Sequence, residues 1–388
     1  MALGPARRSK RQAGQTREVP TAERNRQHIP NPVSTAEDGG PTATGWLLRG
    51  KDDRLTAYAP ALGGVLRWTE TMPGGPDWTG PELVARAEGL QPFLAVAQGA
   101  DGYVHFFGVR QTPVGGGDEV RTDIVHAIQY QTGRPVKEWQ PLGTPYPNDW
   151  KLAVQIGRPA AVVDGGGNVH VFVRNVGGGV CARSQTSTGA WKPWADLKGS
   201  GAHGRLAAGA ADGGRAEVLA PARESVMRWV QDGDQPLFTR DGDIPSHVQD
   251  GSVSAVATGE DRLTFFWRDE KSGEVQAWRQ DSVPEPLGGA SGSGPVSLLR
   301  AAVDGHDCTL MAHRDTDGRP ALAAYPTETE SAGAVWTGTG EACVGAPALA
   351  VDARGRVVLA AFAADGSLRL TRQKTNEPGL AMEAWIRI

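Results

Sequence analysis

The sequence predicts an all-β fold, a seven-bladed β-propeller, on three observations. A strand-turn-strand signal recurs seven times at intervals of 43 to 63 residues, a spacing typical of radial β arrays. The 52 Gly and 27 Pro serve many turns, and no apolar run is sustained at helical spacing. Apolar residues occupy both faces of the repeated strand, as expected where a blade packs between two neighbours. The first-hairpin turns fall at Asp53, Asp101, Asp164, Asp212, Asp261, Asp304 and Asp352.

The strand after each turn is apolar at every position except the second. Six of the seven copies keep a polar residue there: Thr56, His105, His170, Glu217, Thr264 and Thr309. If this column faces the central channel, the side chains from His105 onward meet around one axis. A His/Glu grouping of that kind binds a cation or shuttles protons. The interpretation we prefer is that these polar residues are satisfied by neighbours and line a wet channel.

A third strand follows a second turn, and it ends in tryptophan in three copies, Trp68, Trp229 and Trp278. Arg183 and Tyr325 stand near the same place in the third and sixth copies. The outermost strand carries a further set, Trp139, Trp194 and Trp385, with Trp78 and Trp336 as weaker copies. The repeat thereby accounts for nearly all of the 12 tryptophans.

We expect one folded domain, because seven copies of one unit must share a single closed core. Residues 1–43 are expected to form a basic, disordered tail, and residues 44–388 the propeller. The expected blades, each with four antiparallel strands, span 44–88, 89–146, 147–200, 201–247, 248–293, 294–343 and 344–388. The second blade is the longest because it carries a glycine-rich loop, 113–118, and a long connection, 144–150.

Charge is distributed unevenly along the chain. The formal net charge is −4, yet residues 1–30 carry +5, which leaves −9 for the remainder. The basic residues of the tail are Arg7, Arg8, Lys10, Arg11, Arg17, Arg24 and Arg26. An acidic body with a basic tail predicts an arm that docks on RNA, DNA, an anionic lipid surface or an acidic protein face. A solvated extension with no specific partner is the alternative.

No stretch approaches the roughly 20 apolar residues of a membrane span, and the N-terminus lacks the apolar segment of a secretory signal. We therefore expect a cytoplasmic protein, unless it uses an unusual export route. Cys181, Cys308 and Cys343 are expected to be packing residues, because three cysteines without regular spacing make a poor disulfide framework. Neither CxxC nor HExxH occurs, so the sequence predicts no metal site and no cofactor.

Three segments of the third blade carry a recognisable pattern. Residues 158–164 contain Pro-Ala-Ala-Val, residues 169–174 end in Phe-Val-Arg, and residues 191–197 read Trp-x-x-Trp-x-x-Leu. They resemble the repeat of the PLL-like bacterial lectins, a family of seven-bladed propellers; blades two, five and seven match in part. The resemblance implies that sugars bind between adjacent blades, on aromatic faces with polar groups beside them. The matching positions are Trp68, Trp229 and Trp278, with Tyr325 as a weaker copy and Arg183 as a departure. The interpretation we prefer is that these rings wedge between blades.

Catalysis has weaker support. The sialidase-type Asp-box, Ser-x-Asp-x-Gly-x-x-Trp, is absent, and the nearest segment, 187–191, lacks the aspartate. Recurring acids such as Asp101, Asp164 and Asp304 stand at turns, where short side chains cap the backbone.

We therefore expect a non-catalytic binding scaffold whose loop faces dock a partner macromolecule, a protein above all, with help from the tail. The alternative is a carbohydrate-binding lectin that uses the interblade aromatic clefts. A second alternative is a glycoside hydrolase or lyase that acts in the central channel. The identity of the partner or ligand and the oligomeric state stay open.

Overall fold

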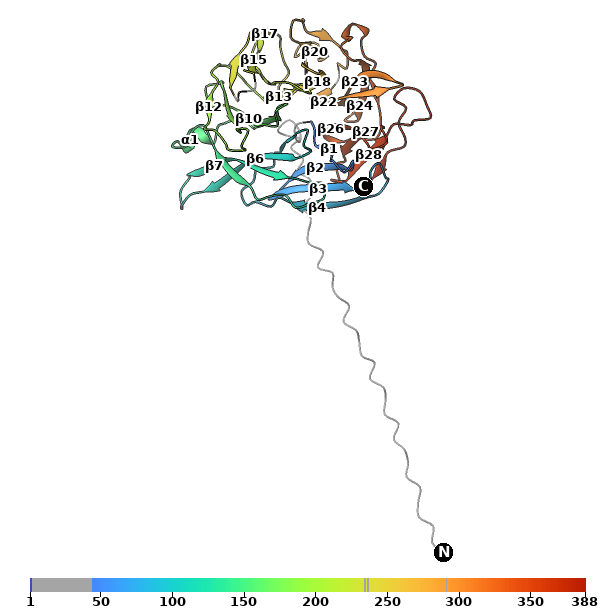
Figure 1. The fold of residues 1–388 in the computed structure, drawn as a ribbon, viewed down its shortest axis with the longest axis horizontal. Coiled ribbons are helices and arrows are strands. Elements are labelled where there is room, and N and C mark those ends of the chain that lie inside the picture. The colour runs from blue at the N-terminus through green and yellow to red at the C-terminus, as the bar shows by residue number, and fades with distance from the viewer. Residues whose placement is uncertain (2–43, 234, 236, 291) are drawn as a thin grey trace.

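The computed structural model describes Met1 and residues 44–388 apart from 234, 236 and 291. Seven antiparallel sheets are arranged around a central axis, which confirms the predicted seven-bladed β-propeller (Figure 1). Six sheets have four strands, and the fourth has a fifth, short strand. Apart from Met1, the tail expected at 1–43 lies outside the described residues.

The first three blades follow one another along the chain in sheets whose strand order is also the sequence order. Blade 1 consists of β1 (Leu47–Arg49), β2 (Leu55–Ala61), β3 (Gly64–Glu70) and β4 (Trp78–Val84). Blade 2 consists of β5 (Ala95–Gln98), β6 (Val104–Pro113), β7 (Val120–Gln129) and β8 (Gln140–Gly143). Blade 3 consists of β9 (Ala160–Val163), β10 (Val169–Arg174), β11 (Val180–Ser184) and β12 (Ala195–Asp196).

The remaining four blades repeat this arrangement. Blade 4 consists of β13 (Ala207–Ala210), β14 (Ala216–Pro221), β15 (Ser225–Gln231), β16 (Phe238–Arg240) and β17 (Ile244–Pro245). Blade 5 consists of β18 (Ser254–Gly259), β19 (Arg262–Arg268), β20 (Val275–Arg279) and β21 (Glu285–Pro286). Blade 6 consists of β22 (Gly292–Val303), β23 (His306–Asp315), β24 (Pro320–Pro326) and β25 (Thr337–Gly338). Blade 7 consists of β26 (Val344–Val351), β27 (Val357–Phe362), β28 (Leu368–Arg372) and β29 (Ile386–Arg387).

Departures from the repeat are local. The glycine-rich loop 113–118 is the tip of the long β6–β7 hairpin, and the connection 144–150 leads into a one-turn helix, α1 (Trp150–Ala153). A 3-10 turn, Glu330–Ala332, lies between β24 and β25. Strand β22 begins at Gly292, inside the segment expected for blade 5, because its first residues continue the pairing with β23 across a β-bulge. No helix in the described part of the chain is long and apolar enough to cross a membrane.

The hydrophobic core is divided among the junctions between blades. The buried residues of the described chain form seven clusters, and each cluster takes its members from two adjacent blades. The last junction joins the two ends of the chain, with Trp46 and Trp68 of blade 1 packed among Ala348, Val358 and Phe362 of blade 7. The ring therefore closes by side-chain packing, since the first and last sheets share no strand.

Tryptophan also cross-links the blades by hydrogen bonds. Within the described residues, one indole N–H at each of the seven junctions donates to the preceding blade or its exit loop, over 2.6–3.2 Å. The donor and acceptor pairs are Trp46 to Ala346 O, Trp139 to Ala85 O, Trp194 to Leu142 O, Trp229 to Leu197 O, Trp267 to Ser246 Oγ, Trp336 to Leu287 O and Trp385 to Thr339 Oγ1. We call these seven residues the staple tryptophans.

Candidate functional site

Blades 4 and 5 are adjacent in the ring (Figure 1). A cleft opens between them. Its volume is about 540 Å³, within the range of small-molecule sites. One wall comes from β15 and the segment after β16, and the other from β20 and the turn after it. The lining residues are Arg228, Asp241, Gly242, Asp243, Ile244, Pro245, Trp278, Gln280, Asp281, Ser282, Val283 and Pro284. We call this the Arg228–Trp278 cleft.

Arg228 organises the inner end of the cleft. Its guanidinium donates from Nε to Glu217 at 2.7 Å and from Nη1 to Asp241 at 2.5 Å. Its Nη2 donates to the side-chain oxygen of Gln280 on blade 5 at 3.1 Å. The same guanidinium lies over the Trp278 ring, 5.4 Å from the ring centre. Because the Arg228 side chain is only 4% exposed, these contacts fix both the arginine and the groups it holds.

The strand registers explain how the two residues meet. Arg228 lies opposite Leu219, the fourth residue of the repeated strand in blade 4, and Trp278 lies opposite Phe265, the third residue in blade 5. At each junction, the residue opposite the fourth position of one blade can be compared with the residue opposite the third position of the next blade. At the other junctions of the described propeller these two residues are Arg67 and Ala127, His126 and Arg183, Ala182 and Trp229, Ala277 and Ala324, Ala323 and Thr371, and Leu370 and Trp68. Only this junction therefore combines an arginine with a tryptophan.

Trp278 differs from the staple tryptophans. Its indole N–H donates to Ser282 O within its own blade, at 3.2 Å, and Trp267 supplies the cross-link at this junction. Trp278 therefore contributes no hydrogen bond between blades among the described residues; it is 7% exposed, and it contacts blade 4 through the Arg228 guanidinium at the cleft wall. Beside it, Val283 is 67% exposed and Pro284 continues the apolar surface.

The outer rim of the cleft is acidic. Asp241 and Asp243 have side chains that are 53% and 42% exposed, and Asp281 is also in the lining. Arg228 pairs with Asp241 and Glu217, and Arg240, outside the lining, pairs with Asp243. The acids at the cleft still outnumber these two arginines, so the rim offers hydrogen-bond acceptors and disfavours anions. The described residues contain no group of three His, Cys, Asp or Glu side chains that could hold a metal ion.

The other residues predicted to bind a ligand have different surroundings. Trp68 and Trp229 are fully buried, and Trp229 is a staple tryptophan with the Arg240 guanidinium over its ring at 5.8 Å. Arg183 donates to the backbone oxygens of Lys192 and Leu142. Tyr325 lies opposite Thr309, one residue out of register with the tryptophans, and its hydroxyl donates to Glu330 at 3.3 Å. Of the predicted set, only Trp278 lines the Arg228–Trp278 cleft.

The five polar residues of the second column are not brought together. His105 bonds His126, His170 bonds Asp164 and Ser184, Glu217 bonds Arg228, Thr264 bonds Thr258, and Thr309 bonds Thr327. None of the five is in the lining of the cavity at the axis. Glu217 alone reaches the candidate site, through Arg228.

The basic residues predicted to bind a partner, Arg7 to Arg26, lie outside the described residues. Partner docking through the tail therefore stays a prediction.

Sequence reasoning missed most of the cleft. Arg228 precedes Trp229 in the third strand, and Arg67 precedes Trp68 in the same way. This Arg-Trp pairing is a usable signal for an arginine beside an aromatic ring, but it does not show that Arg228 lies over Trp278 of the next blade. Gln280, Asp241 and Asp243 lie in loops outside the repeat, so no periodic pattern marks them.

No family model matches this sequence, and no curated protein matches it. Among solved structures, the BP39L lectin from Burkholderia pseudomallei is similar with a TM-score of 0.63 at 15% identity, over 90% of this chain and 99% of that one. A protein of unknown function from Dyadobacter fermentans has a TM-score of 0.49 at 14% identity, over 79% and 97%. A six-bladed lectin from Aleuria aurantia has a TM-score of 0.44 at 14% identity, over 88% and 93%. The likeness to BP39L is one of fold. It confirms the predicted resemblance to bacterial lectin propellers at that level.

Proposed function

We propose that this protein is a carbohydrate-binding propeller that holds a neutral saccharide in the Arg228–Trp278 cleft. The observation that carries the proposal is the convergence of Arg228, Trp278 and Gln280 from two blades beneath a rim of exposed carboxylates. The similarity of fold to the BP39L lectin supports the class of function, although a fold hosts many functions and the site must carry the argument.

The chemistry of the cleft matches that of a sugar. A pyranose presents hydroxyl groups on its rim and C–H groups on its faces, so it needs both hydrogen-bonding partners and apolar surface. The carboxylates of Asp241 and Asp243 accept hydrogen bonds from hydroxyls, and the amide of Gln280 donates to them. Val283, Pro284 and the edge of Trp278 supply the apolar surface. The acidic rim selects against sialic and uronic acids.

Saccharide binding can be tested with variants on the exposed rim. We expect the full-length protein to bind neutral glycans on an array, and Asp243→Asn combined with Gln280→Ala to weaken binding by at least about tenfold, because each lost hydrogen bond contributes about 1 kcal/mol. Both residues are exposed, so we expect the fold to be retained, and the circular dichroism spectrum of the variant checks this because Gln280 also accepts a hydrogen bond from the buried Arg228. Titration calorimetry with the best array hit measures the loss.

Glu341→Gln is the matched control. Glu341 is an exposed acid paired with an arginine, as Asp243 is, but it lines a different cavity, between blades 6 and 7. We expect this variant to bind like the unmodified protein. Binding that survives in Asp243→Asn/Gln280→Ala places the sugar elsewhere, and the absence of any glycan hit removes the proposal.

A further inference from the structure

Two arginines orient the hydrogen-bonding groups on the walls of the Arg228–Trp278 cleft. Arg228 lies in β15, and its guanidinium is 5.4 Å from the ring centre of Trp278. Arg240 ends β16, and its guanidinium is 5.8 Å from the ring centre of Trp229. Contact with an aromatic face holds a guanidinium in place. Because a guanidinium only donates hydrogen bonds, each arginine determines which atom of a neighbouring polar group faces it.

Gln280 is held as a hydrogen-bond donor. Arg228 Nη2 donates to the side-chain oxygen of Gln280 at 3.1 Å, and the amide cannot turn its nitrogen toward the guanidinium because both groups would then be donors. Gln280 is exposed at the cleft, and its Nε2 donates to none of the described residues. A ligand therefore meets a donor at this point of the wall and must turn an acceptor toward it.

Asp243 and Asp281 are held as acceptors. Arg240 Nη2 donates to Asp243 Oδ1 at 2.7 Å, and Asp243 Oδ2 accepts no hydrogen bond from the described residues. The Asp281 carboxylate, in the wall of blade 5, has no hydrogen bond or ion pair with any described residue. Asp241 is already engaged through both oxygens, by Arg228 and by the backbone of the next residue. Two carboxylates of the cleft thus remain to accept hydrogen bonds from a ligand.

We propose that the cleft selects saccharides by this pattern of one donor and two acceptors, with Arg228 and Arg240 as positioning residues. The inference rests on the saccharide binding proposed above. A hydroxyl group both donates and accepts, so a sugar with free hydroxyl groups satisfies Gln280, Asp243 and Asp281 together. An ether oxygen only accepts, so it can face Gln280 but leaves a carboxylate without its hydrogen bond. The ligand class is consequently a saccharide with at least two free hydroxyl groups, and sugars O-methylated at those positions are rejected.

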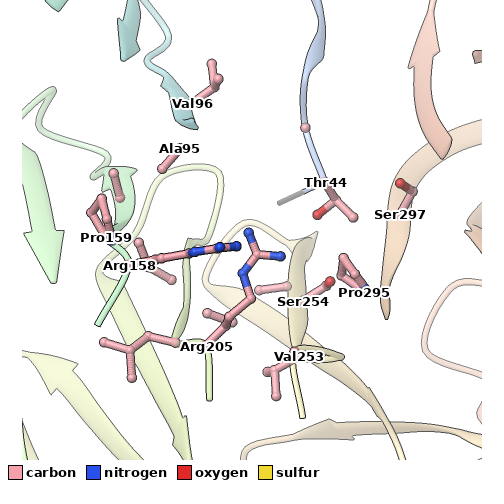
Figure 2. Close-up of a pocket in the computed structure, with 18 of the residues that line it drawn as sticks. Thr44, Ala95, Val96, Arg158, Pro159, Arg205, Val253, Ser254, Pro295 and Ser297 are labelled. Atoms are coloured by element: carbon pink, nitrogen blue, oxygen red, sulfur yellow. The ribbon is translucent and has the colours of Figure 1, made fainter. Parts of the chain in front are cut away.

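The cavity on the axis of the propeller has a different lining. Figure 2 shows two of its side chains, Arg158 and Arg205, and the described lining contains no acidic residue. Of these two cavities, only the cleft therefore offers carboxylate acceptors. A preference that depends on Asp243 places the saccharide in the cleft and not on the axis.

Deoxyfluoro sugars test the pattern, because fluorine is close to a hydroxyl group in size but donates no hydrogen bond. The probes are methyl glycosides of neutral hexoses, deoxyhexoses and N-acetylhexosamines, and then the monofluoro derivatives of the glycoside that binds best. Titration calorimetry with the full-length protein measures each affinity. We expect fluorine to weaken binding at least about tenfold at two positions, those that face Asp243 and Asp281, and less than about threefold at the position that faces Gln280.

Asp243→Asn and Gln280→Glu reverse the pattern one group at a time. In Asp243→Asn, Arg240 still holds the side-chain oxygen, so N–H groups replace the free Oδ2. We expect weaker binding of the parent glycoside and no fluorine penalty at one of the two sensitive positions. In Gln280→Glu a carboxylate oxygen replaces the N–H groups, so the tolerant position becomes sensitive to fluorine. A merely structural role would change the affinity for every derivative by the same factor.

Glu341→Gln, in the cavity between blades 6 and 7, is the matched control and should keep the pattern of the unmodified protein. Equal fluorine penalties at all positions overturn the inference, as does a pattern that either Asp243→Asn or Gln280→Glu leaves unchanged; saccharide binding itself then stands. If no methyl glycoside binds the unmodified protein, the proposed function fails and takes this inference with it. The fluorine series on the unmodified protein needs no variant, so misfolding of a variant does not remove the test.

Discussion

At the scale of single residues, burial decides the chemistry of the polar column. His105 Nδ1 and His126 Nε2 are 3.0 Å apart in a hydrogen bond at the junction of blades 2 and 3, and both side chains are buried. Desolvation lowers the pKa of His105 from 6.5 to about 4 and that of His126 to about 3. When both imidazoles are neutral, the N–H of one ring donates a hydrogen bond to the unprotonated nitrogen of the other, whereas two imidazolium ions would repel one another. At neutral pH the pair is therefore uncharged, and its role is structural.

The histidine pair makes stability depend on pH. Below about pH 6.5 these two histidines become protonated in the unfolded chain but stay neutral in the folded chain. The free energy of unfolding therefore falls as the pH falls from about 6.5 toward the folded pKa values. Each group contributes a loss of up to about 1.4 kcal/mol per pH unit. We expect His126→Phe to flatten the curve of unfolding free energy between pH 6.5 and 4, measured by urea denaturation. Replacing the exposed His306 with Gln should leave the curve unchanged; an equally steep curve in His126→Phe contradicts this account.

At the scale of elements, each blade is fastened to the previous one through the staple tryptophans. A propeller blade has few main-chain bonds to its neighbours, so side chains must supply the contacts that hold the ring. An indole ring fills the space between two sheets while its N–H donates to a backbone carbonyl or, for Trp267 and Trp385, to a side-chain hydroxyl of the preceding blade or its exit loop. This dual role explains why tryptophan, rather than phenylalanine, recurs in the repeat.

Trp229→Phe tests the staple. The phenyl ring keeps most of the packing but leaves Leu197 O without the bond it now accepts at 2.8 Å. We expect stability to fall by about 1–3 kcal/mol, seen as a lower urea midpoint. Trp150→Phe, on the partly exposed helix α1, is the comparison and should change the midpoint little. Equal midpoints for the two variants would show that the N–H bonds contribute nothing.

At the scale of the whole molecule, the ring closes without a shared strand, and a buried ion pair lies at the closure. Arg372 of blade 7 donates to Glu70 Oε1 of blade 1 at 3.1 Å and to Gly75 O at 2.8 Å. The other carboxylate oxygen of Glu70 accepts from the backbone of Leu55 and Gly74. The side chains of Glu70 and Arg372 are 0% and 4% exposed, respectively. The first and last blades are thereby joined by a buried ion pair. Removing either partner of such a pair alone costs several kcal/mol, because the other charge stays buried.

Glu70→Gln should consequently destabilise the junction between blades 1 and 7. The substitution removes the closer of the two carboxylates that balance the buried Arg372 charge and leaves only Asp352 Oδ2, 3.6 Å from Arg372 Nε. We expect a loss of about 3 kcal/mol, measured by chemical denaturation. Limited proteolysis should cut first near the blade 1 and blade 7 junction. Asp196→Asn, which breaks the exposed Asp196–Lys198 pair, should have no measurable effect. Equal stability of the two variants would mean that apolar packing alone closes the ring.

The number of blades and their turns followed from the sequence because their causes are local. Asp53 and Asp304 adopt positive φ at first-hairpin turns, and the alternation of apolar residues fixes which strands are covered on both faces. Contacts between blades are not local. Arg228 meets Trp278 only because blade 5 packs against blade 4 and sets β20 beside β15. The sequence by itself thus determined a seven-fold β repeat rich in tryptophan. The tertiary structure alone decided which tryptophans are staples, which one faces a cleft, and where charges of one sign converge, because those depend on distances between residues that no period in the chain encodes.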